Sequence, residues 1–302
     1  MEKKTLIVIV GPTAVGKTRT SIWLAHLLGC PMINADSRQV FKEMKIGTAR
    51  PGPDEVQGVE HYFLGDRSVE EEFSAGHFER EGLKLLERIF STHSNIILSG
   101  GSGLYVDALC FGFDKLPKVP QSLRDNLNQK YKRVGIIPLL EELKKLDPVY
   151  YLEVNKQNPQ RVIRSLEVCL HAGIPFSSFR KNKKQKREFD LLFVGLELPR
   201  SELYNNIDER VESMLKEGLV GEVRKLIKYK ELNALKTVGY SEVFSFLAGE
   251  ISEEEMVNKI KQNTRRYAKR QMTWFKKNDL IRWFHPDELK EIEDWIKSNL
   301  QT

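Results

Sequence analysis

Short apolar runs alternate with helical patterns along the N-terminal part of the chain. Apolar runs at 6–10, 32–35 and 96–98 predict three buried strands, with helical patterns between them. A fourth run at 191–198 predicts a late strand, and the stretch 281–284 predicts an edge strand. Strands that alternate with helices usually form a parallel sheet covered on both faces. The pattern therefore predicts an α/β fold with a parallel sheet core.

The segment between the third and fourth predicted strands is helical and polar instead. We expect it to form an inserted helical subdomain at 115–188, which divides the core into residues 1–114 and 189–302. After the fourth strand the chain is predicted to be helical up to the edge strand. The fold expected is thus a parallel-sheet core with a helical insertion and a helical C-terminal region.

The clearest helix of the insertion has signals at both ends. It is predicted to begin at Asn158, to carry Pro159 at its first position and to end near Gly173. Its apolar stripe consists of Val162, Leu166, Cys169 and Leu170. Arg161 and Arg164 lie off that stripe, as Gln160 does, so we expect two guanidinium groups one turn apart that are free to bind a ligand.

A second long helix is predicted near the C-terminus. Ser252 and Glu255 form the pattern of a capping box, and the helical pattern continues to about Lys277. Four large side chains recur at helical spacing, and we interpret them as core anchors rather than base-stacking residues. They are Met256, Ile260, Tyr267 and Trp274.

The most specific motif joins the first predicted strand to a helix expected at 20–28. Residues 5–18 read TLIVIVGPTAVGKT and contain the phosphate-binding pattern G-x-x-x-x-G-K-T. Glycines let backbone N–H groups turn toward one anion, Lys17 adds a positive charge, and the Thr18 hydroxyl can bind Mg²⁺. The residues predicted to hold a di- or triphosphate are Gly11, Pro12, Thr13, Ala14, Val15, Gly16, Lys17 and Thr18.

Polar residues follow the second and third predicted strands. Ligands of open α/β sheets bind at the carboxyl ends of the strands, where this chain places NADSRQ and SGGSGLY. Asp36 is expected beside the phosphate loop, as a proton acceptor or a water-mediated Mg²⁺ ligand, with Ser37 and Gln39 close by. The third strand ends in Ser99 and two glycines, where NTPases more often carry an acidic Mg²⁺ ligand. This difference argues against ATP hydrolysis.

Charge and composition narrow the class of partner. The 302 residues carry 48 basic and 42 acidic side chains, a net charge of +6. Six of the eight residues at 180–187 are basic, and residues 259–282 carry nine basic residues against one acidic, Asp279. In a phosphate-loop protein these runs favour nucleic acid as a partner, although solvated surface is the alternative.

Other function classes are excluded by what the sequence lacks. No apolar run is long enough to cross a bilayer and no targeting segment is recognised, so we expect a cytoplasmic protein without membrane contact. Cys30, Cys110 and Cys169 are widely spaced in apolar surroundings, and we expect buried free thiols rather than a disulfide or zinc site.

Seven segments together resemble the tRNA dimethylallyltransferase family, the tRNA isopentenyltransferases. In order they are GPTAVGKT, NADSRQVF, GGSGLY, NPQRVIR, GLVGEVRKL, VGYSE and KRQMTWF. Because no Cys/His zinc module follows the core, the resemblance is to bacterial-type members. It implies transfer of a dimethylallyl group from its diphosphate to N6 of the adenosine 3′-adjacent to the anticodon, with release of diphosphate.

The resemblance also implies roles for residues of this chain. The phosphate loop with Mg²⁺ would hold the donor's diphosphate, Asp36 would be the general base on N6, and Ser102 would lie near donor and base. Arg224 is the candidate for a second cationic contact to the diphosphate, with a surface ion pair as the alternative. Contacts to the tRNA anticodon stem-loop are implied for Asp36, Ser37, Arg38, Gln39, Gln160, Arg161, Val162, Ile163 and Arg164. A monomer is the simplest expectation.

Three other functions remain open at this point. An adenylate isopentenyltransferase would act on a free nucleotide and would not need the basic insertion. A small-molecule kinase is favoured only by the phosphate loop, and it predicts tight ATP binding. A non-catalytic RNA-binding protein would keep its role after loss of Asp36 or Lys17.

Overall fold

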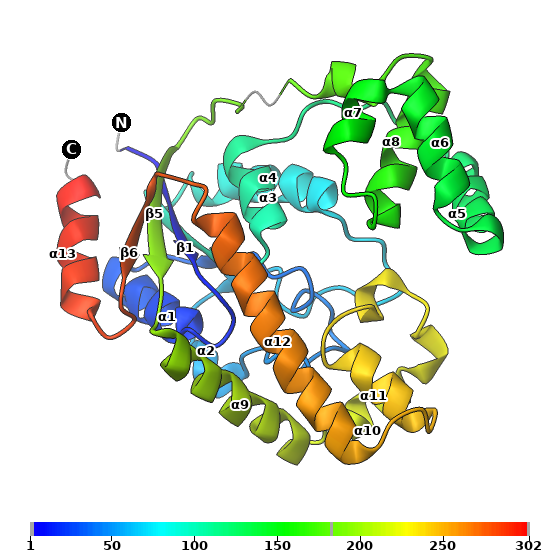
Figure 1. The fold of residues 1–302 in the computed structure, drawn as a ribbon. Coiled ribbons are helices and arrows are strands. Elements are labelled where there is room, and N and C mark those ends of the chain that lie inside the picture. The colour runs from blue at the N-terminus through cyan, green and yellow to red at the C-terminus, as the bar shows by residue number, and fades with distance from the viewer. Residues whose placement is uncertain (1–2, 182–183, 301–302) are drawn as a thin grey trace. The chain divides into compact units, whose positions relative to one another are not determined.

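The computed structural model describes residues 3–181 and 184–300 (Figure 1). Within these residues six strands form one sheet in the order β3-β2-β4-β1-β5-β6, and all neighbouring strands are parallel. The strands are β1 (Thr5–Val10), β2 (Met32–Asn34), β3 (His61–Tyr62), β4 (Asn95–Gly100), β5 (Asp190–Leu196) and β6 (Ile281–Phe284). The predicted parallel α/β sheet is confirmed, and the two-residue β3 is the strand that the apolar pattern did not predict.

Helices connect the strands and make up the insertion. The α-helices are α1 (Lys17–Leu28), α2 (Pro53–Val56), α3 (Ala75–Ile89), α4 (Gly103–Phe111), α5 (Gln121–Val134), α6 (Ile137–Leu146), α7 (Pro148–Glu153), α8 (Pro159–Ala172), α9 (Arg200–Lys216), α10 (Leu219–Lys225), α11 (Tyr240–Leu247), α12 (Glu253–Phe275) and α13 (Leu289–Leu300). Short 3₁₀ helices are η1 (Phe176–Phe179), η2 (Ile227–Tyr229) and η3 (Asn233–Leu235). None of the described helices is long and apolar enough to cross a membrane.

The chain divides into two compact units. The insertion unit is Gly112–Gln185, which holds α5 to α8 and η1, and the core unit comprises the described residues before and after it. The insertion thus begins three residues before the predicted 115 and ends three before the predicted 188. Gly112 follows the end of α4 with a φ of +74°, so the chain turns away from helical geometry at that point.

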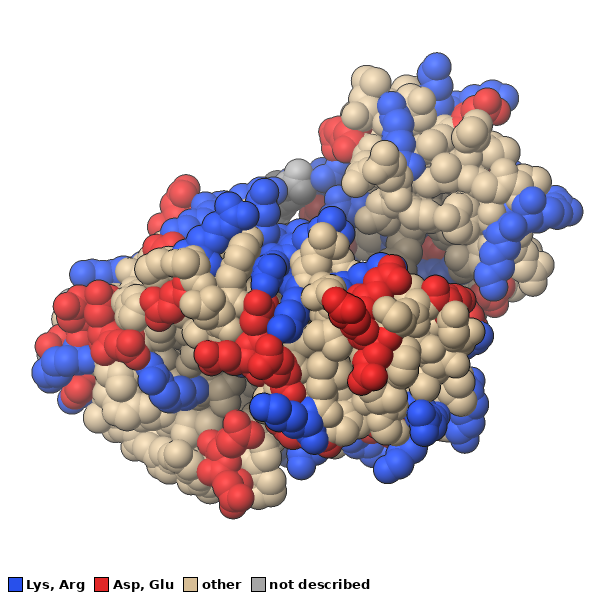
Figure 2. Space-filling model, turned by 60° about the horizontal axis from the view of Figure 1, so that its bottom comes forward, with Lys and Arg blue, Asp and Glu red and all other residues tan. Residues whose placement is uncertain are grey.

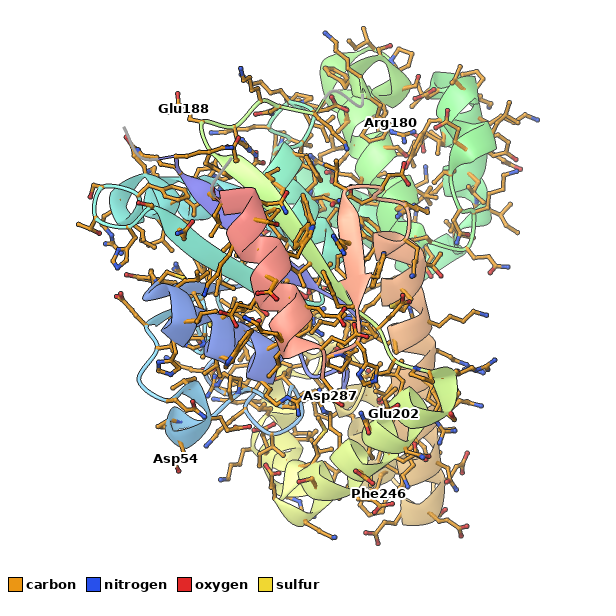
Figure 3. All side chains as sticks on the ribbon, turned by 90° about the vertical axis from the view of Figure 1, so that its left-hand side faces the viewer. Asp54, Arg180, Glu188, Glu202, Phe246 and Asp287 are labelled. Carbon is orange, nitrogen blue, oxygen red and sulfur yellow. The ribbon has the colours of Figure 1, made fainter. Side chains whose placement is uncertain are left out.

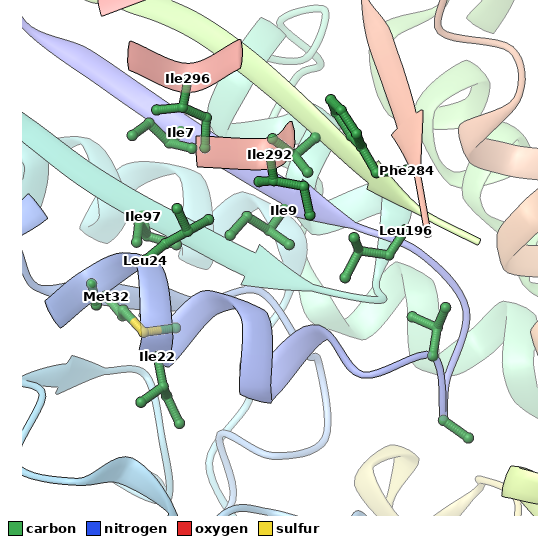
Figure 4. Close-up of a cluster of buried hydrophobic side chains, with 14 of the residues drawn as sticks. Ile7, Ile9, Ile22, Leu24, Met32, Ile97, Leu196, Phe284, Ile292 and Ile296 are labelled. Carbon is green, nitrogen blue, oxygen red and sulfur yellow. The ribbon is translucent and has the colours of Figure 1, made fainter. Parts of the chain in front are cut away.

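Both faces of the central strand β1 are buried in the core unit. On one face, Ile7 and Ile9 belong to a cluster with Leu24 of α1 and with Ile292 and Ile296 of α13 (Figure 4). On the opposite face, Phe193 of β5 stacks on Phe111 of α4 at 5.8 Å between ring centroids. Helices therefore cover both sides of the sheet, as expected for strands that are apolar along most of their length.

The connection from β6 to α13 returns to the start of α1. Arg19 donates a hydrogen bond to the carbonyl of Pro286 at 3.2 Å and forms an ion pair with Asp287, which Figure 3 labels. His285 lies 3.7 Å from Asp287 and 3.9 Å from Glu202 of α9. These polar contacts hold α9 and the last helix beside the beginning of α1.

The insertion unit has an apolar core of its own. Helix α8 starts at the predicted place, because the Asn158 side chain accepts a hydrogen bond from the N–H of Arg161 at 3.2 Å. It ends at Gly173, whose φ is +70°. Three of the predicted stripe residues are buried, whereas Leu170 is 41% exposed and lies outside that core. The capping signals therefore predicted the helix more precisely than the stripe did.

The long helix predicted near the C-terminus is α12. Ser252 caps it by accepting a hydrogen bond from the N–H of Glu255 at 3.1 Å. The Glu255 carboxylate forms an ion pair with Lys259, one turn later, at 2.8 Å. It does not accept the hydrogen bond from the Ser252 N–H that would complete a capping box. Met256 and Ile260 are buried core residues, as predicted.

A glycine at the end of β4 gives the first testable prediction. A Cβ on Gly100 would lie 2.3 Å from the carbonyl carbon and oxygen of Ala35, and this neighbour is backbone. We expect Gly100→Ala to lower the free energy of unfolding by about 1–3 kcal/mol, because the two chain segments must separate.

The matched control is Gly221→Ala in α10, where nothing lies within 4 Å of an added Cβ. Its helical position should gain up to about 1 kcal/mol. Urea unfolding of both variants measures the difference, and equal effects would contradict the close approach at Gly100.

Candidate active site

The loop between β1 and α1 has the backbone geometry of an anion site. Gly11 and Gly16 have φ values of +151° and +99°, and a Cβ on Gly11 would lie 2.6 Å from the carbonyl oxygen of Leu196. Ala14 also has a positive φ, +66°, which the sequence did not indicate. The first N–H groups of α1 have no helical partner and lie at the positive end of its dipole. The loop therefore has a backbone conformation that suits a phosphate group.

Two cations meet at this loop. The Lys17 ammonium donates hydrogen bonds to the carbonyls of Gly11 and Pro12 at 3.1 and 2.7 Å. Arg210 of α9 donates one to the Thr13 hydroxyl at 3.1 Å. Burial, together with the charge of Arg210, lowers the pKa of Lys17 to about 7, and only Asp36 acts in the opposite direction. A bound diphosphate would relieve the repulsion between the two cations.

The cations line a large cavity of the core unit. Its volume is about 780 Å³, and it is bounded by the phosphate loop, Asp36, Arg210 and the Ser99–Gly101 stretch after β4. It thus lies at the carboxyl ends of β1, β2 and β4. Thr18 also lines this cavity.

A second, smaller cavity of about 90 Å³ adjoins the large one. Both are lined by Thr13, Asp36, Thr48 and Arg210. The apolar residues that line the small cavity are Val211, Met214, Val238 and Ile260, and Met214 also lines the large cavity. Tyr267 of α12 lines the small cavity too, so one predicted core anchor borders the site. The small cavity therefore adds apolar lining to a junction that charged and polar groups also border.

Asp36 is held by the turn that follows β2. Its Oδ1 accepts hydrogen bonds from the N–H groups of Arg38 at 2.8 Å and Gln39 at 3.2 Å. The N–H of Ser37 donates to the Ser102 hydroxyl at 2.9 Å, and that hydroxyl donates to Ser37 Oγ at 3.1 Å. The predicted residues after β2 and β4 are thus brought together, and Asp36 presents its carboxylate at both cavities.

Gln271 of α12 completes the site, and sequence reasoning missed it. Its Oε1 accepts the N–H of Thr13 at 2.8 Å, and its Nε2 donates to the carbonyl of Gly101 at 2.9 Å. The side chain is only 5% exposed, and it joins the phosphate loop to the loop after β4. A polar residue inside the KRQMTWF segment of a largely apolar helix face was the available signal.

Comparison with known proteins places the chain in a family. The family model described as IPP transferase matches residues 39–278. The tRNA dimethylallyltransferase of Cytophaga hutchinsonii is 48% identical over 298 residues, which cover 99% of this chain and 98% of that protein. The tRNA dimethylallyltransferase 1 of Bacteroides fragilis is 45% identical over 301 residues, 100% of both chains. The chain belongs to the IPP transferase family.

Solved structures agree with this assignment. The tRNA isopentenylpyrophosphate transferase of Bacillus halodurans superposes with a TM-score of 0.74 at 34% identity, covering 99% of this chain and 97% of that one. A eukaryotic dimethylallyltransferase acting on tRNA gives a TM-score of 0.75 at 28% identity, covering 90% of this chain and 70% of that one. The resemblance seen in the sequence motifs is therefore confirmed at the level of family and fold.

One predicted site residue of this IPP transferase lies elsewhere. Arg224 is exposed on α10 and is not among the residues that line either cavity. Its neighbour Val223 is fully buried, whereas Arg224 lies on the exposed part of the helix surface. Arg210, one helix earlier, is the second cation at the phosphate loop.

The residues predicted on α8 divide into two groups. Gln160 and Arg161 are exposed, whereas Val162 and Ile163 are buried in the core of the insertion unit, where their side chains contact protein. Arg164 is not free, because it forms an ion pair with Glu167. Arg124 of α5 donates to both carboxylate oxygens of the same Glu167, at 2.8 and 2.6 Å.

The basic runs are partly neutralised within the protein. Residues 182 and 183 of the first run lie outside the described residues. In the same run Arg180 pairs with Glu153, and the largely buried Arg187 lies 2.8 Å from Glu79. On α12, Arg265 pairs with Asp208. Figure 2 accordingly shows both charge signs spread over the visible face.

The depressed pKa of Lys17 gives a prediction for pH dependence. In the free protein Lys17 loses its proton around pH 7, whereas an anion beside it favours the protonated form. Diphosphate binding should therefore take up a proton between about pH 7 and 9, and the affinity should fall as the pH rises through that range.

Calorimetric titration with inorganic diphosphate, in two buffers of different ionisation enthalpy, measures this proton uptake. Lys17→Met should bind more weakly and lose the uptake that belongs to the lysine. The same uptake in Lys17→Met would assign the proton to the diphosphate itself and contradict the prediction.

Proposed function

We propose that the protein transfers a dimethylallyl group from dimethylallyl diphosphate to N6 of the adenosine 3′-adjacent to the anticodon of tRNA. The observation that carries the proposal is Asp36 at the junction of the two cavities, beside the cations Lys17 and Arg210. The family relationship and the names of the similar proteins support the same chemistry.

In this proposal each part of the site has a task. The bond between the allylic carbon and the diphosphate oxygen breaks, and the carbon forms a new bond to N6. Negative charge grows on the leaving diphosphate, where the phosphate loop, Lys17 and Arg210 stabilise it. N6 loses a proton to the carboxylate of Asp36. Ser102 fixes the turn that carries Asp36 through its bonds to Ser37.

Magnesium fits the residues of the large cavity. The Thr18 hydroxyl and the Asp36 carboxylate both line it, and Mg²⁺ favours oxygen ligands together with substrate phosphates. Thr18 by itself supplies few ligands, so it would hold the ion jointly with the diphosphate, and the Asp36 carboxylate would keep its role as proton acceptor. When bound, Mg²⁺ would neutralise charge on the diphosphate.

Transfer RNA is the acceptor in this proposal. The target adenosine must leave its base stack to reach Asp36. Ser37, Arg38 and Gln39 lie next to Asp36, and Gln160 and Arg161 offer exposed contacts on the insertion unit. We also propose that the protein acts in the cytoplasm and as a monomer. Every site residue named above belongs to one chain, so the proposed chemistry needs no second copy.

Replacement of the proposed base tests the function directly. Asp36→Asn should keep donor binding and lower kcat by about 10²- to 10⁴-fold, because N6 loses its proton acceptor. Purified protein is incubated with Mg²⁺, dimethylallyl diphosphate and unmodified tRNA, and the nucleosides are analysed by mass. Asp294→Asn, an exposed position on α13, is the control and should retain full activity.

Parallel reactions separate the alternative functions. Product on AMP instead of tRNA would identify an adenylate isopentenyltransferase. Phosphoryl transfer from ATP without any prenylation would identify a kinase. Prenylated tRNA with undiminished kcat in Asp36→Asn would refute the general-base role alone.

Phosphate contacts should make tRNA binding depend on salt. Arg161→Ala should make the slope of log affinity against log salt less negative by about 1, because one cationic contact is lost. Arg161→Lys keeps the charge and should keep the slope. Filter binding at several salt concentrations measures both variants, and an unchanged slope in Arg161→Ala would remove this residue from the interface.

A further inference from the structure

The GLVGEVRKL segment contains a carboxylate with an unusual set of partners. Glu222 of α10 accepts hydrogen bonds from three consecutive backbone N–H groups, those of Lys45 at 2.9 Å, Ile46 at 2.8 Å and Gly47 at 3.0 Å. Consecutive N–H groups that converge in this way form a concave anion site, and here the anion is a side chain of the same protein. The loop after β2 is thus fastened to α10.

A second motif adds to this fastening. The hydroxyl of Tyr240, a fully buried residue, donates to Oε1 of Glu222 at 2.6 Å. Gly47 packs so closely on the Tyr240 ring that an added Cβ would lie 2.5 Å from it. Glu222 therefore joins the loop at 45–47 to the start of α11 at one point.

The residues held in this way form walls of the site. Gly47 and Thr48 line the small cavity together with Asp36, and so do Val238 and Gly239, just before Tyr240. A Cβ on Gly239 would lie 3.8 Å from the carbonyl oxygen of Gly47, so the two segments are neighbours. The far end of the loop is fixed by Gln39, whose side chain donates to the carbonyls of Thr48 and Ala49 at 3.0 and 3.1 Å. The loop is thus held at two points, by the Gln39 side chain close to Asp36 and by the Glu222 carboxylate.

We propose that Glu222 is a positioning residue that sets the width of the small cavity and thereby restricts the donor to a short prenyl chain. This inference rests on the proposed function, in which the apolar side of the small cavity receives the dimethylallyl group. A carboxylate can accept from all four donors, whereas a glutamine amide must turn its NH₂ group toward at least one of the N–H donors. The loop would then move away from Val238 and Gly239, and the cavity would widen.

The test compares Glu222→Gln with Tyr240→Phe, which removes one of the four bonds, and with Lys225→Ala, an exposed position on the same helix. For each, kcat/KM is measured on tRNA with dimethylallyl diphosphate and with the ten-carbon geranyl diphosphate. Glu222→Gln should lower the preference for the shorter donor by about tenfold or more. Tyr240→Phe should shift it less in the same direction, and Lys225→Ala should leave it unchanged.

Two further measurements separate positioning from general damage. The affinity for inorganic diphosphate should stay within about twofold in all variants, because the phosphate loop does not depend on Glu222. Hydrogen exchange of the amides of 45–47 should speed up in Glu222→Gln. Lost activity with an unchanged donor preference would overturn the proposal, as would unchanged exchange at these amides.

The design distinguishes this inference from the proposed function. Wild-type protein that prenylates no tRNA would refute the function and, with it, the chain-length part of the inference. The amide exchange would still test the positioning role. If Glu222→Gln does not fold, the Tyr240→Phe variant decides: an unshifted donor preference there refutes the proposal.

Discussion

The site depends on two cations that the fold holds close together against their mutual repulsion. Lys17 reaches the phosphate loop from α1 and Arg210 from α9, and burial makes their charges more costly. Such an arrangement is stable only if the surrounding elements are rigid. It also means that binding a diphosphate removes a repulsion already present in the free protein, which favours an anionic ligand over a neutral one. Other residues of the core unit hold the loops around Lys17 and Arg210 in place.

That support consists of polar side chains that bridge separate elements. Gln271 joins the phosphate loop to the loop after β4, and Ser102 joins that loop to the turn bearing Asp36. Each bridge satisfies backbone groups that the sheet leaves unpaired at its carboxyl edge. Glu222 extends the same principle to the loop at 45–47. Residues within several of the sequence motifs thus connect the loops that border the two cavities.

The sequence predicted those features whose causes are local. Gly11, Gly16 and Lys17 are recognisable because the loop's geometry depends on adjacent residues, and α8 was located by Asn158 and Gly173 at its ends. The sequence predicted Arg224 as the second cation and did not indicate Arg210, because neither the spacing nor the composition of a helix shows which side chain a distant loop will meet. Gln271 and Glu222 were missed for the same reason, since the backbone groups that they bind lie 170 or more residues away in sequence.

The positive charge that the insertion unit can offer to a ligand also depends on contacts between residues that are distant in sequence. The fully buried carboxylate of Glu167 neutralises part of the positive charge of Arg124 and Arg164, and bonds from both guanidinium groups lower its pKa although burial alone would raise it. The number of basic residues therefore overstates the charge available to a phosphate backbone. Because the carboxylate also fixes the direction of the guanidinium groups, this surface is suited to recognise the spacing of phosphates more than their number.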